Sequence, residues 1–242
     1  MQKINLFIIK LKTSYTNFIQ TMICIASIFK REYLLTFRNF YDILMVLIFF
    51  LLGVLIFVFA IGPDKKIYSQ IGIGLIWTLL LFSSNLSIKK FYQDDFEDGS
   101  TILFYISGIS FEIIVIIKIV TNWLFFQSPF LLIIPIACLM LEIEQDKIPL
   151  LLLTFAIGSL ILTSLSSISN SMNLLNDKNI VIGSVIVMLF SIPIIIFSVA
   201  IVEAQVDLIK AQIKILLGIL MIFLAITPWI SAYCIRIALQ NK

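Results

Sequence analysis

ILMVLIFFLLGVLIFVFAI, residues 43–61, contains no charged side chain and no proline. A run of about 20 apolar residues is long enough for an α-helix to cross the hydrocarbon core of a bilayer, which is about 30 Å thick. The stretch therefore predicts a transmembrane helix, Ile43–Ile61, and an integral membrane protein.

Five further stretches meet the same criterion. They are Gln70–Ile88, Ile119–Leu141, Pro149–Ser171, Ile180–Val202 and Leu216–Ala238. The chain of 242 residues is 61% hydrophobic and 13% charged, whereas an ordinary soluble domain is about 45–50% apolar. This composition excludes a water-soluble fold, and the long uninterrupted runs exclude the alternating strands of a transmembrane barrel. We expect an all-α integral membrane protein with six transmembrane helices.

Two features predict irregular spans. The apolar region Thr101–Ile117 precedes the third span, so it either begins that span early or lies partly in the membrane interface. Proline removes a backbone donor and kinks a helix. Prolines occur in the third, fifth and sixth spans, at Pro129, Pro135, Pro193 and Pro228. They act either as hinges or as fixed packing features.

The lysine and arginine residues indicate which ends of the spans face the cytoplasm, because cytoplasmic loops retain an excess of them. With both termini inside, twelve basic residues are cytoplasmic and five are external. The cytoplasmic set is Lys3, Lys10, Lys12, Lys30, Arg31, Arg38, Lys89, Lys90, Lys118, Lys178, Arg236 and Lys242, and the external set is Lys65, Lys66, Lys147, Lys210 and Lys214. We therefore expect an N-in and C-in arrangement.

Residues 1–42 contain no apolar stretch long enough for a signal-peptide core. We expect them to form a cytoplasmic or interfacial segment before the membrane domain, residues 43–242. Within this segment, Ile28–Tyr41 mixes apolar and charged side chains and predicts an elbow helix in the inner headgroup layer. A second amphipathic stretch places Val206, Ile209 and Ile213 opposite Asp207, Lys210 and Lys214. We expect that stretch to lie on the outer surface.

Residue content limits the chemistry of the chain. Histidine is absent from the sequence, which removes the commonest metal ligand, the usual haem ligand and the usual general base. The cysteines, Cys24, Cys138 and Cys234, are far apart and are expected to be apolar packing residues. No glycine is followed by lysine, so a G-x-x-x-x-G-K phosphate loop is missing. We expect no catalytic, cofactor-binding or metal-binding residue, no enzyme activity of this chain by itself, and no nucleic-acid partner.

The most distinctive polar segment is KKFYQDDFEDGS, residues 89–100, directly after the second span. It carries four carboxylates, Asp94, Asp95, Glu97 and Asp98. Such a cluster binds a divalent cation, serves as acid and base, engages a basic partner or is simply a solvated charged turn. Aromatic side chains lie among the carboxylates, as they do in docking surfaces. They are Phe91, Tyr92 and Phe96.

Two spans are unusually polar in their cytoplasmic halves. The fourth carries Thr163, Ser164, Ser166, Ser167, Ser169, Asn170, Ser171 and Asn173, and the second carries Ser83, Ser84, Asn85 and Ser87. Small polar side chains allow close helix packing or bond to carbonyls of their own helix. The alternative is a subunit or transport interface.

Several motifs of this sequence resemble the heme exporter protein B (CcmB) family, the permease of cytochrome c maturation. They are Ile61-Gly62-Pro63, Ile71-Gly72-Ile73-Gly74-Leu75-Ile76-Trp77 and Phe91-Tyr92-Gln93-Asp94-Asp95 through Asp98-Gly99-Ser100, followed by Lys118, Trp123, the prolines named above and Arg236-Ile237-Ala238. The resemblance runs from about Ile28 to the C-terminus. Thr101-Ile102 stand where the family typically continues Leu-Glu, and the first 27 or so residues look like an extension.

The resemblance implies an ABC-2-type permease-like fold and a subunit that couples ATP hydrolysis by a separate chain to haem export or to release of a haem-loaded chaperone. It implies a CcmA-like ATP-binding subunit and CcmC-, CcmD- and CcmE-like membrane partners. Haem would be handled by the complex and not bound directly by this chain. The permease would be in contact with membrane lipid, and it would form a homodimer or pair with another membrane subunit.

The same resemblance implies that residues 89–118 form the cytoplasmic coupling segment that contacts the ATPase. The expected contact residues are Phe91, Tyr92, Asp94, Asp95, Asp98 and Gly99. Two alternatives stay open for the function, an ABC-2-type exporter of another lipid or drug and a membrane assembly scaffold that transports nothing. We expect the bacterial inner membrane, or the mitochondrial inner membrane if the chain is encoded in an organelle.

Overall fold

The computed structural model describes residues 22, 24–37, 40–62, 64–87, 91–175 and 180–241, without the side chains of 85–87, 180–182, 184 and 206. All regular structure in these ranges is helical. Six of the described helices are long and apolar enough to cross a membrane. The prediction of an all-α membrane protein with six spans is therefore confirmed. Lys3, Lys10, Lys12, Arg38, Lys89, Lys90, Lys178 and Lys242, which entered the orientation argument, lie outside the described residues.

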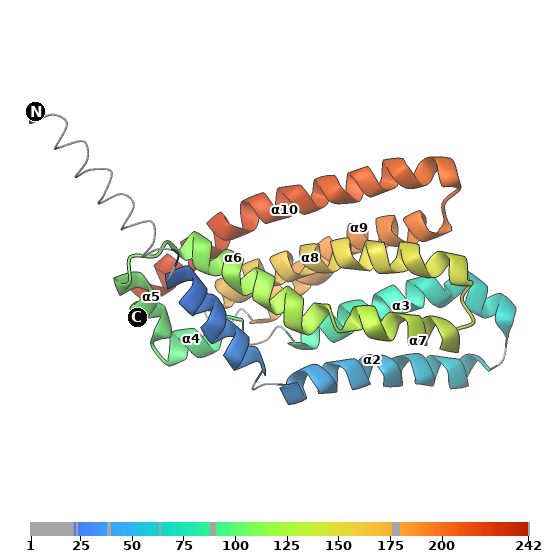
Figure 1. Cartoon of the computed structure of the whole chain (residues 1–242), viewed down its shortest axis with the longest axis horizontal. Coiled ribbons are helices and arrows are strands. Elements are labelled where there is room, and N and C mark those ends of the chain that lie inside the picture. Colours follow the sequence, from blue (N-terminus) through green and yellow to red (C-terminus); the bar gives the residue numbers. More distant parts are fainter. Residues whose placement is uncertain are drawn as a thin grey trace, which may run out of the picture.

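The helices follow one another in simple order, after a helix over residues 24–37. The spans are α2 (Phe40–Ile61), α3 (Lys65–Ser87), the interrupted α6 (Phe111–Asn122) and α7 (Phe130–Met140), α8 (Ile148–Asn173), α9 (Ile180–Glu203) and α10 (Val206–Gln240). Short helices α4 (Gln93–Glu97) and α5 (Ser100–Ile106) follow α3, and a 3₁₀ turn, η2 (Gln145–Lys147), precedes α8. The spans lie side by side, with α4, α5 and helix 24–37 gathered at one end (Figure 1).

The third span begins at Phe111, earlier than the predicted Ile119. This agrees with the alternative in which the region Thr101–Ile117 begins the span. A turn at Gly108, whose φ is +74°, separates α5 from α6, so only the second part of that region joins the span. Between α6 and α7 lies a π-helical turn, η1 (Trp123–Gln127), in which the Ser128 N–H donates to the Trp123 carbonyl. Pro129, which has no N–H, follows directly. The span is thus interrupted by an identifiable break in its hydrogen bonding.

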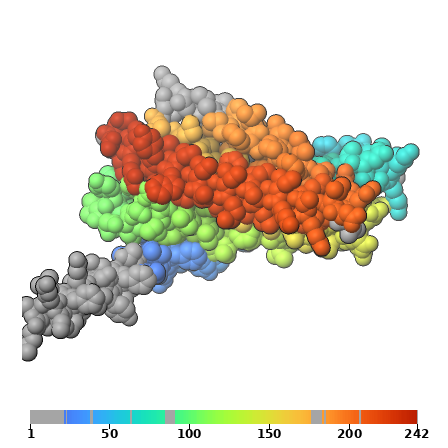
Figure 2. Space-filling model, turned by 90° about the horizontal axis from the view of Figure 1, so that it is seen from above, coloured from blue at the N-terminus to red at the C-terminus, as the bar shows by residue number. Residues whose placement is uncertain are grey.

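The amphipathic stretch Val206–Lys214, which was expected on the outer surface, is continuous with the sixth span. These residues are the first turns of α10, which continues as one helix of 35 residues to Gln240. Ile209 and Ile213 pack against a cluster of buried side chains from α3, α8, α9 and α10. At 1.5 Å per residue α10 is about 52 Å long, well beyond the hydrocarbon thickness of about 30 Å. Figure 2 shows it running along the length of one face.

Helix α8 is the centre of the fold, since α3, α6, α7, α9 and α10 all contact it. Two glycines set how closely its neighbours approach. At Gly158 of α8 a Cβ would lie 2.6 Å from the Trp77 ring, and at Gly183 of α9 a Cβ would collide with Ser169 Oγ. Trp77 is fully buried and packs on Phe155. The tryptophan-bearing motif of α3 is therefore part of the core.

Two ends of the bundle carry the charges. One end holds the α2–α3 turn, η2 and the start of α10, where Lys65 Nζ lies 2.9 Å from Glu142 Oε2. The opposite end holds helix 24–37, α4, α5, the start of α6 and the end of α10 (Figure 1). There Arg236 Nη2 lies 2.6 Å from Glu112 Oε1. Among the residues that the structure describes, the basic residues assigned to opposite sides of the membrane thus lie at opposite ends of the bundle.

Candidate functional site

Segment 91–106 contains α4 and α5 and lies at one end of the bundle (Figure 1). Its turn depends on Gly99, whose φ of +81° suits glycine and strains other residues. Asp98 closes the same turn, because its Oδ1 accepts the Ser100 N–H at 2.8 Å. The segment is thus a short helix, a tight turn and a second short helix.

Asp95, at the middle of α4, points into the protein. It is 6% exposed and touches two cations. Lys118 Nζ of α6 lies 2.5 Å from Oδ2, and Arg31 Nη2 of helix 24–37 donates to Oδ1 at 2.6 Å. Arg31 also donates to Ser100 Oγ at 3.1 Å. Asp95 therefore joins the segment to two elements far away in sequence.

Glu32 completes this arrangement from helix 24–37 and is also buried, at 8% exposure. Its Oε2 lies 3.1 Å from Lys118 Nζ, and its Oε1 accepts from Arg31 Nη1 at 2.8 Å. Each carboxylate thus touches both cations, and each cation touches both carboxylates. We call Arg31, Glu32, Asp95 and Lys118 the ion-pair ring.

The charges of the ring shift the ionisation of its members. Burial alone raises the pKa of Asp95, but the attraction and hydrogen bonds of Lys118 and Arg31 outweigh burial and hold this pKa below its ordinary value. Burial alone lowers the pKa of Arg31, and the hydrogen bond to Asp95 with the nearby carboxylates raises it overall. Both groups are therefore ionised at neutral pH.

Tyr92 fixes the start of the segment to a different part of the bundle. Its hydroxyl is hydrogen-bonded to Ser167 of α8 at 2.7 Å, and Ser167 lies 3.2 Å from Ser231 of α10. Lys118 Nζ lies 5.8 Å from the centre of the Tyr92 ring. Burial raises the pKa of Tyr92 well above its usual range, so the hydroxyl is neutral. Phe91 beside it packs into the apolar cluster of α6 and α10.

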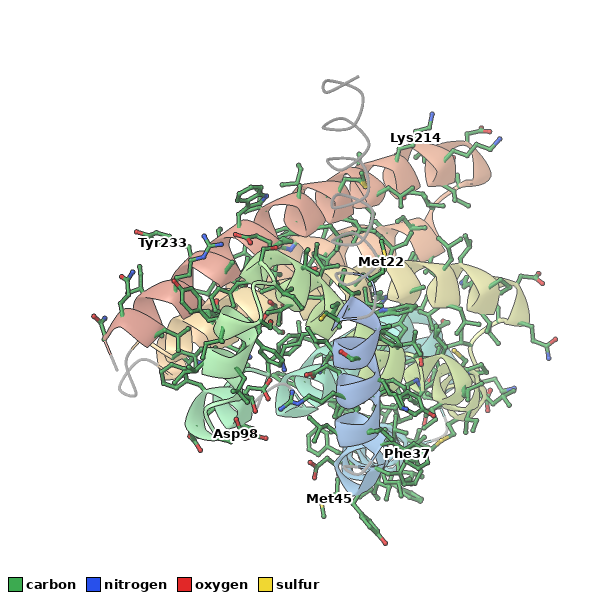
Figure 3. The ribbon with its side chains drawn as sticks, turned by 60° about the vertical axis from the view of Figure 1, so that its left-hand side comes forward. Met22, Phe37, Met45, Asp98, Lys214 and Tyr233 are labelled. Atoms are coloured by element: carbon green, nitrogen blue, oxygen red, sulfur yellow. The ribbon has the colours of Figure 1, made fainter. Side chains whose placement is uncertain are left out.

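The other carboxylates of the segment face away from the core. Asp94, Glu97 and Asp98 are exposed, and Figure 3 shows Asp98 at the outside of this end, with Lys214 at the far end of α10. Glu97 Oε1 accepts a hydrogen bond from Gln93, its neighbour on α4, and Asp98 Oδ2 lies 3.9 Å from Arg31. We call Asp94, Glu97 and Asp98 the acidic face. Exposed apolar side chains of α5 lie next to it in the chain, namely Ile102, Leu103, Tyr105 and Ile106.

The residues predicted from the sequence as ATPase contacts thus separate into two groups. Phe91, Tyr92 and Asp95 are turned inward and make contacts within the chain, so we leave them out of the docking surface proposed below. Asp94, Asp98 and Gly99 lie on the outer side or in the turn, where the docking role stays a prediction. In the part of the chain that the structure describes, no group of three or more acidic or cysteine side chains is arranged to hold a metal ion.

Three members of the ion-pair ring were missed as site residues: Arg31, Glu32 and Lys118. The sequence holds a signal for one of them, because Lys118 stands alone inside IIVIIKIV, residues 113–120. A lone lysine within a buried apolar stretch requires a buried carboxylate partner.

The polar halves of α3 and α8 show the packing arrangement expected of small polar side chains. Ser83 and Ser84 donate to carbonyls one turn earlier, as do Thr163 and Ser164. Others link helices: Ser84 bonds to Gln127 of η1, and Ser159 accepts from the Trp123 indole at 2.8 Å. These bonds tie the interrupted third span to α3 and α8.

The family model described as CcmB protein matches residues 23–238, which reach from helix 24–37 into the last turn of α10. The chain belongs to the CcmB family. Heme exporter protein B of Haemophilus influenzae is 34% identical over 161 residues, which cover 66% of this chain and 73% of that relative. Heme exporter protein B of Pseudomonas aeruginosa is 31% identical over 57% of this chain and 62% of its own length.

A CcmB relative from an organelle is also similar. The putative cytochrome c biogenesis ccmB-like mitochondrial protein of Marchantia polymorpha is 33% identical over 52% of this chain and 44% of its own length. The CcmB match begins at residue 23, so it includes helix 24–37 with Arg31 and Glu32.

Proposed function

We propose that this CcmB-family chain is the membrane permease subunit of an ABC-type exporter that acts in cytochrome c maturation, with haem as the cargo of the complex. The family membership, the six spans and the names of the relatives support this function. The bacterial inner membrane is the proposed site of action, with the ring-bearing end in the cytoplasm. The excess of lysine and arginine assigned to that side supports this orientation.

The energy for transport comes from a separate ATP-hydrolysing subunit, which we propose to be CcmA-like. The sequence has no G-x-x-x-x-G-K loop to hold ATP phosphates. The observation that carries this proposal is the two-sided character of segment 91–106. Its inner side is held by the ion pairs of Asp95 and by the buried Tyr92, while Asp94, Glu97 and Asp98 present negative charge outward. A basic surface on the ATPase fits such a face.

Other membrane proteins complete the proposed complex. An ABC exporter alternates access between two membrane halves, so we propose a second copy of this chain or another membrane subunit as the other half. CcmC-, CcmD- and CcmE-like proteins are proposed to handle haem beside it. Because the chain has no histidine, we propose that its own task is conversion of ATP hydrolysis into movement, and not ligation of haem iron.

The test compares two double variants that reverse charge at opposite ends of the bundle. Asp94→Lys/Glu97→Lys changes the acidic face, and Glu144→Lys/Asp146→Lys is the matched control at the other end, where both side chains are also exposed. We expect the first to lose co-purification with the ATPase and the second to retain it, when both accumulate in membranes to the wild-type level. Wild-type co-purification of the first variant would remove the acidic face as the docking surface.

The function itself is tested by covalent haem in c-type cytochromes, visualised by peroxidase staining of a gel. We expect the stain to disappear when the gene is deleted and to return with the wild-type gene or with the control variant. Normal staining after deletion would reject a role in cytochrome c maturation and leave an exporter of another cargo or an assembly scaffold.

A further inference from the structure

Two contacts of different chemistry hold segment 91–106 to the bundle. On one side, Asp95 enters the ion-pair ring with helix 24–37 and α6. On the other side, the Tyr92 hydroxyl meets Ser167 of α8, which in turn meets Ser231 of α10. The segment is thus attached to two different groups of helices.

The ion-pair ring is closed, with opposite charges alternating around it. Its four contacts between charged groups measure 2.5, 2.6, 2.8 and 3.1 Å, and Asp95, Glu32 and Lys118 have side chains no more than 10% exposed. Taking away one member leaves a buried charge without compensation, which costs far more than an exposed ion pair gains. The ring therefore resists opening.

The Tyr92 contact has a different character. Its bonds join neutral hydroxyl groups, and neutral hydrogen bonds are about half as strong as bonds between charged groups. When a force acts on the segment, this neutral contact is the weaker of the two attachments. Glu112 of α6 is itself ion-paired with Arg236 of α10, so α10 stays with α6. The segment should therefore part from α8 before it parts from helix 24–37 and α6.

We propose that the ion-pair ring is a permanent joint that makes helix 24–37, segment 91–106 and α6 move as one rigid body, while the contact of Tyr92 with Ser167 of α8 opens. Lys118 is the positioning residue at its centre. This inference rests on the proposed function, in which the ATPase moves segment 91–106. The rigid body ends where α6 meets the π-helical turn Trp123–Gln127, whose irregular hydrogen bonding suits a hinge in the third span.

The test measures two distances by spin labelling in the full chain, reconstituted in lipid vesicles with its ATPase. Labels at Lys30→Cys and Ile106→Cys report the distance within the rigid body, and Ile106 lies outside the acidic face. Labels at Ile106→Cys and Leu175→Cys report the distance from the segment to the end of α8. All three positions are exposed, and Cys24→Ser removes the one described cysteine that is partly accessible. On ATP binding we expect the first distance to stay constant and the second to shift.

Variants of the joint complete the test. Lys118→Met should broaden the Lys30–Ile106 distance distribution before ATP is added and let that distance change when ATP binds, while Lys118→Arg should retain the narrow wild-type distribution. Should Lys118→Met fail to accumulate, Arg31→Gln makes the same comparison at a side chain that is 31% exposed.

The outcomes separate this joint from the proposed function. A wild-type Lys30–Ile106 distance that shifts with ATP as much as the Ile106–Leu175 distance would overturn the joint, as would an unchanged distribution in Lys118→Met. If the ATPase is bound and neither spin-label distance changes on ATP binding, the movement that the joint is proposed to transmit does not occur. Failure of the ATPase to bind would contradict the proposed function, and the Lys118→Met comparison in the free chain would still decide whether the ring is a rigid joint.

Discussion

Lys118 Nζ of α6 lies 2.5 Å from Asp95 Oδ2 of α4, and both side chains are 8% exposed. This pair joins a membrane span to the segment that follows another span. It also explains how Asp95 stays ionised in a buried position, since burial of a carboxylate without a partner would favour its neutral form. The stability of this end of the protein should therefore depend on each charge in the ring.

Replacement of Lys118 by methionine should lower the free energy of unfolding by about 3–5 kcal/mol, because the buried carboxylates of Glu32 and Asp95 lose a shared cation. The change keeps the length of the side chain, so a loss of packing contributes little. The measurement is unfolding of the purified protein in mixed micelles, with increasing denaturing detergent.

The control for that change is Lys65→Met, because Lys65 forms an ion pair with Glu142 but its side chain is 84% exposed. An exposed ion pair contributes about 0–1 kcal/mol. Equal effects of the two substitutions would contradict the structural importance of burial at Lys118.

Asp95→Asn should show how the ring depends on pH. The folded-state pKa of Asp95 is lowered from its ordinary value of 3.8, so ionised Asp95 stabilises the folded state fully above that value. This contribution is lost as the pH falls through the lowered folded-state pKa. The stability difference between wild type and Asp95→Asn should be constant from pH 7 to about 5 and shrink below about 4.

Unfolding in the same micelles at several pH values measures that difference. A difference that shrinks already between pH 7 and 6 would mean that another group, and not Asp95, controls the ring.

Tyr92→Phe tests the neutral contact with α8. The ring stays in place and only the hydroxyl is lost, so we expect a loss of about 1 kcal/mol in the free energy of unfolding. Ser167 keeps its contact with Ser231, which limits the loss. Tyr105→Phe is the control, since Tyr105 is 68% exposed and its ring stacks on Phe111 in either form. A loss as large as that of Lys118→Met would contradict the assignment of this contact as the weaker attachment.

Much of the fold was predictable because its physical cause is local. Each span is recognisable in the sequence as about 20 apolar residues. For the predicted span Ile43–Ile61, the observed helix α2 begins only three residues earlier, at Phe40. That Val206–Lys214 continues into the sixth span was not predicted, and the reason is equally clear. An amphipathic pattern shows that one side of a helix is covered, and it does not show whether protein or a headgroup layer covers it. Here Ile209 and Ile213 are covered by protein.

The site was less predictable because its contacts join residues distant in sequence. Asp94 and Asp95 are adjacent acidic residues, and nothing in the sequence around them shows that one is exposed and the other buried. That difference follows from the direction in which α4 packs on Lys118 and Arg31. The family resemblance correctly drew attention to this segment, but burial separates its charges into an inner ring and an outer acidic face.

Close helix packing around α8 gives the last prediction, Gly158→Ala. The added Cβ would lie 2.6 Å from the ring of Trp77, a fully buried residue of α3. Overpacking of this kind costs about 1–3 kcal/mol. The control is Gly74→Ala on α3, where a Cβ meets nothing within 4 Å, so the lower flexibility of the unfolded chain should stabilise the protein by about 0.4–1 kcal/mol. Both free energies of unfolding are measured in one detergent system. Opposite signs for the two glycine-to-alanine substitutions would show that contact with Trp77 decides the result. A stabilising effect at Gly158 would mean that α3 and α8 are packed less closely than the structure has them.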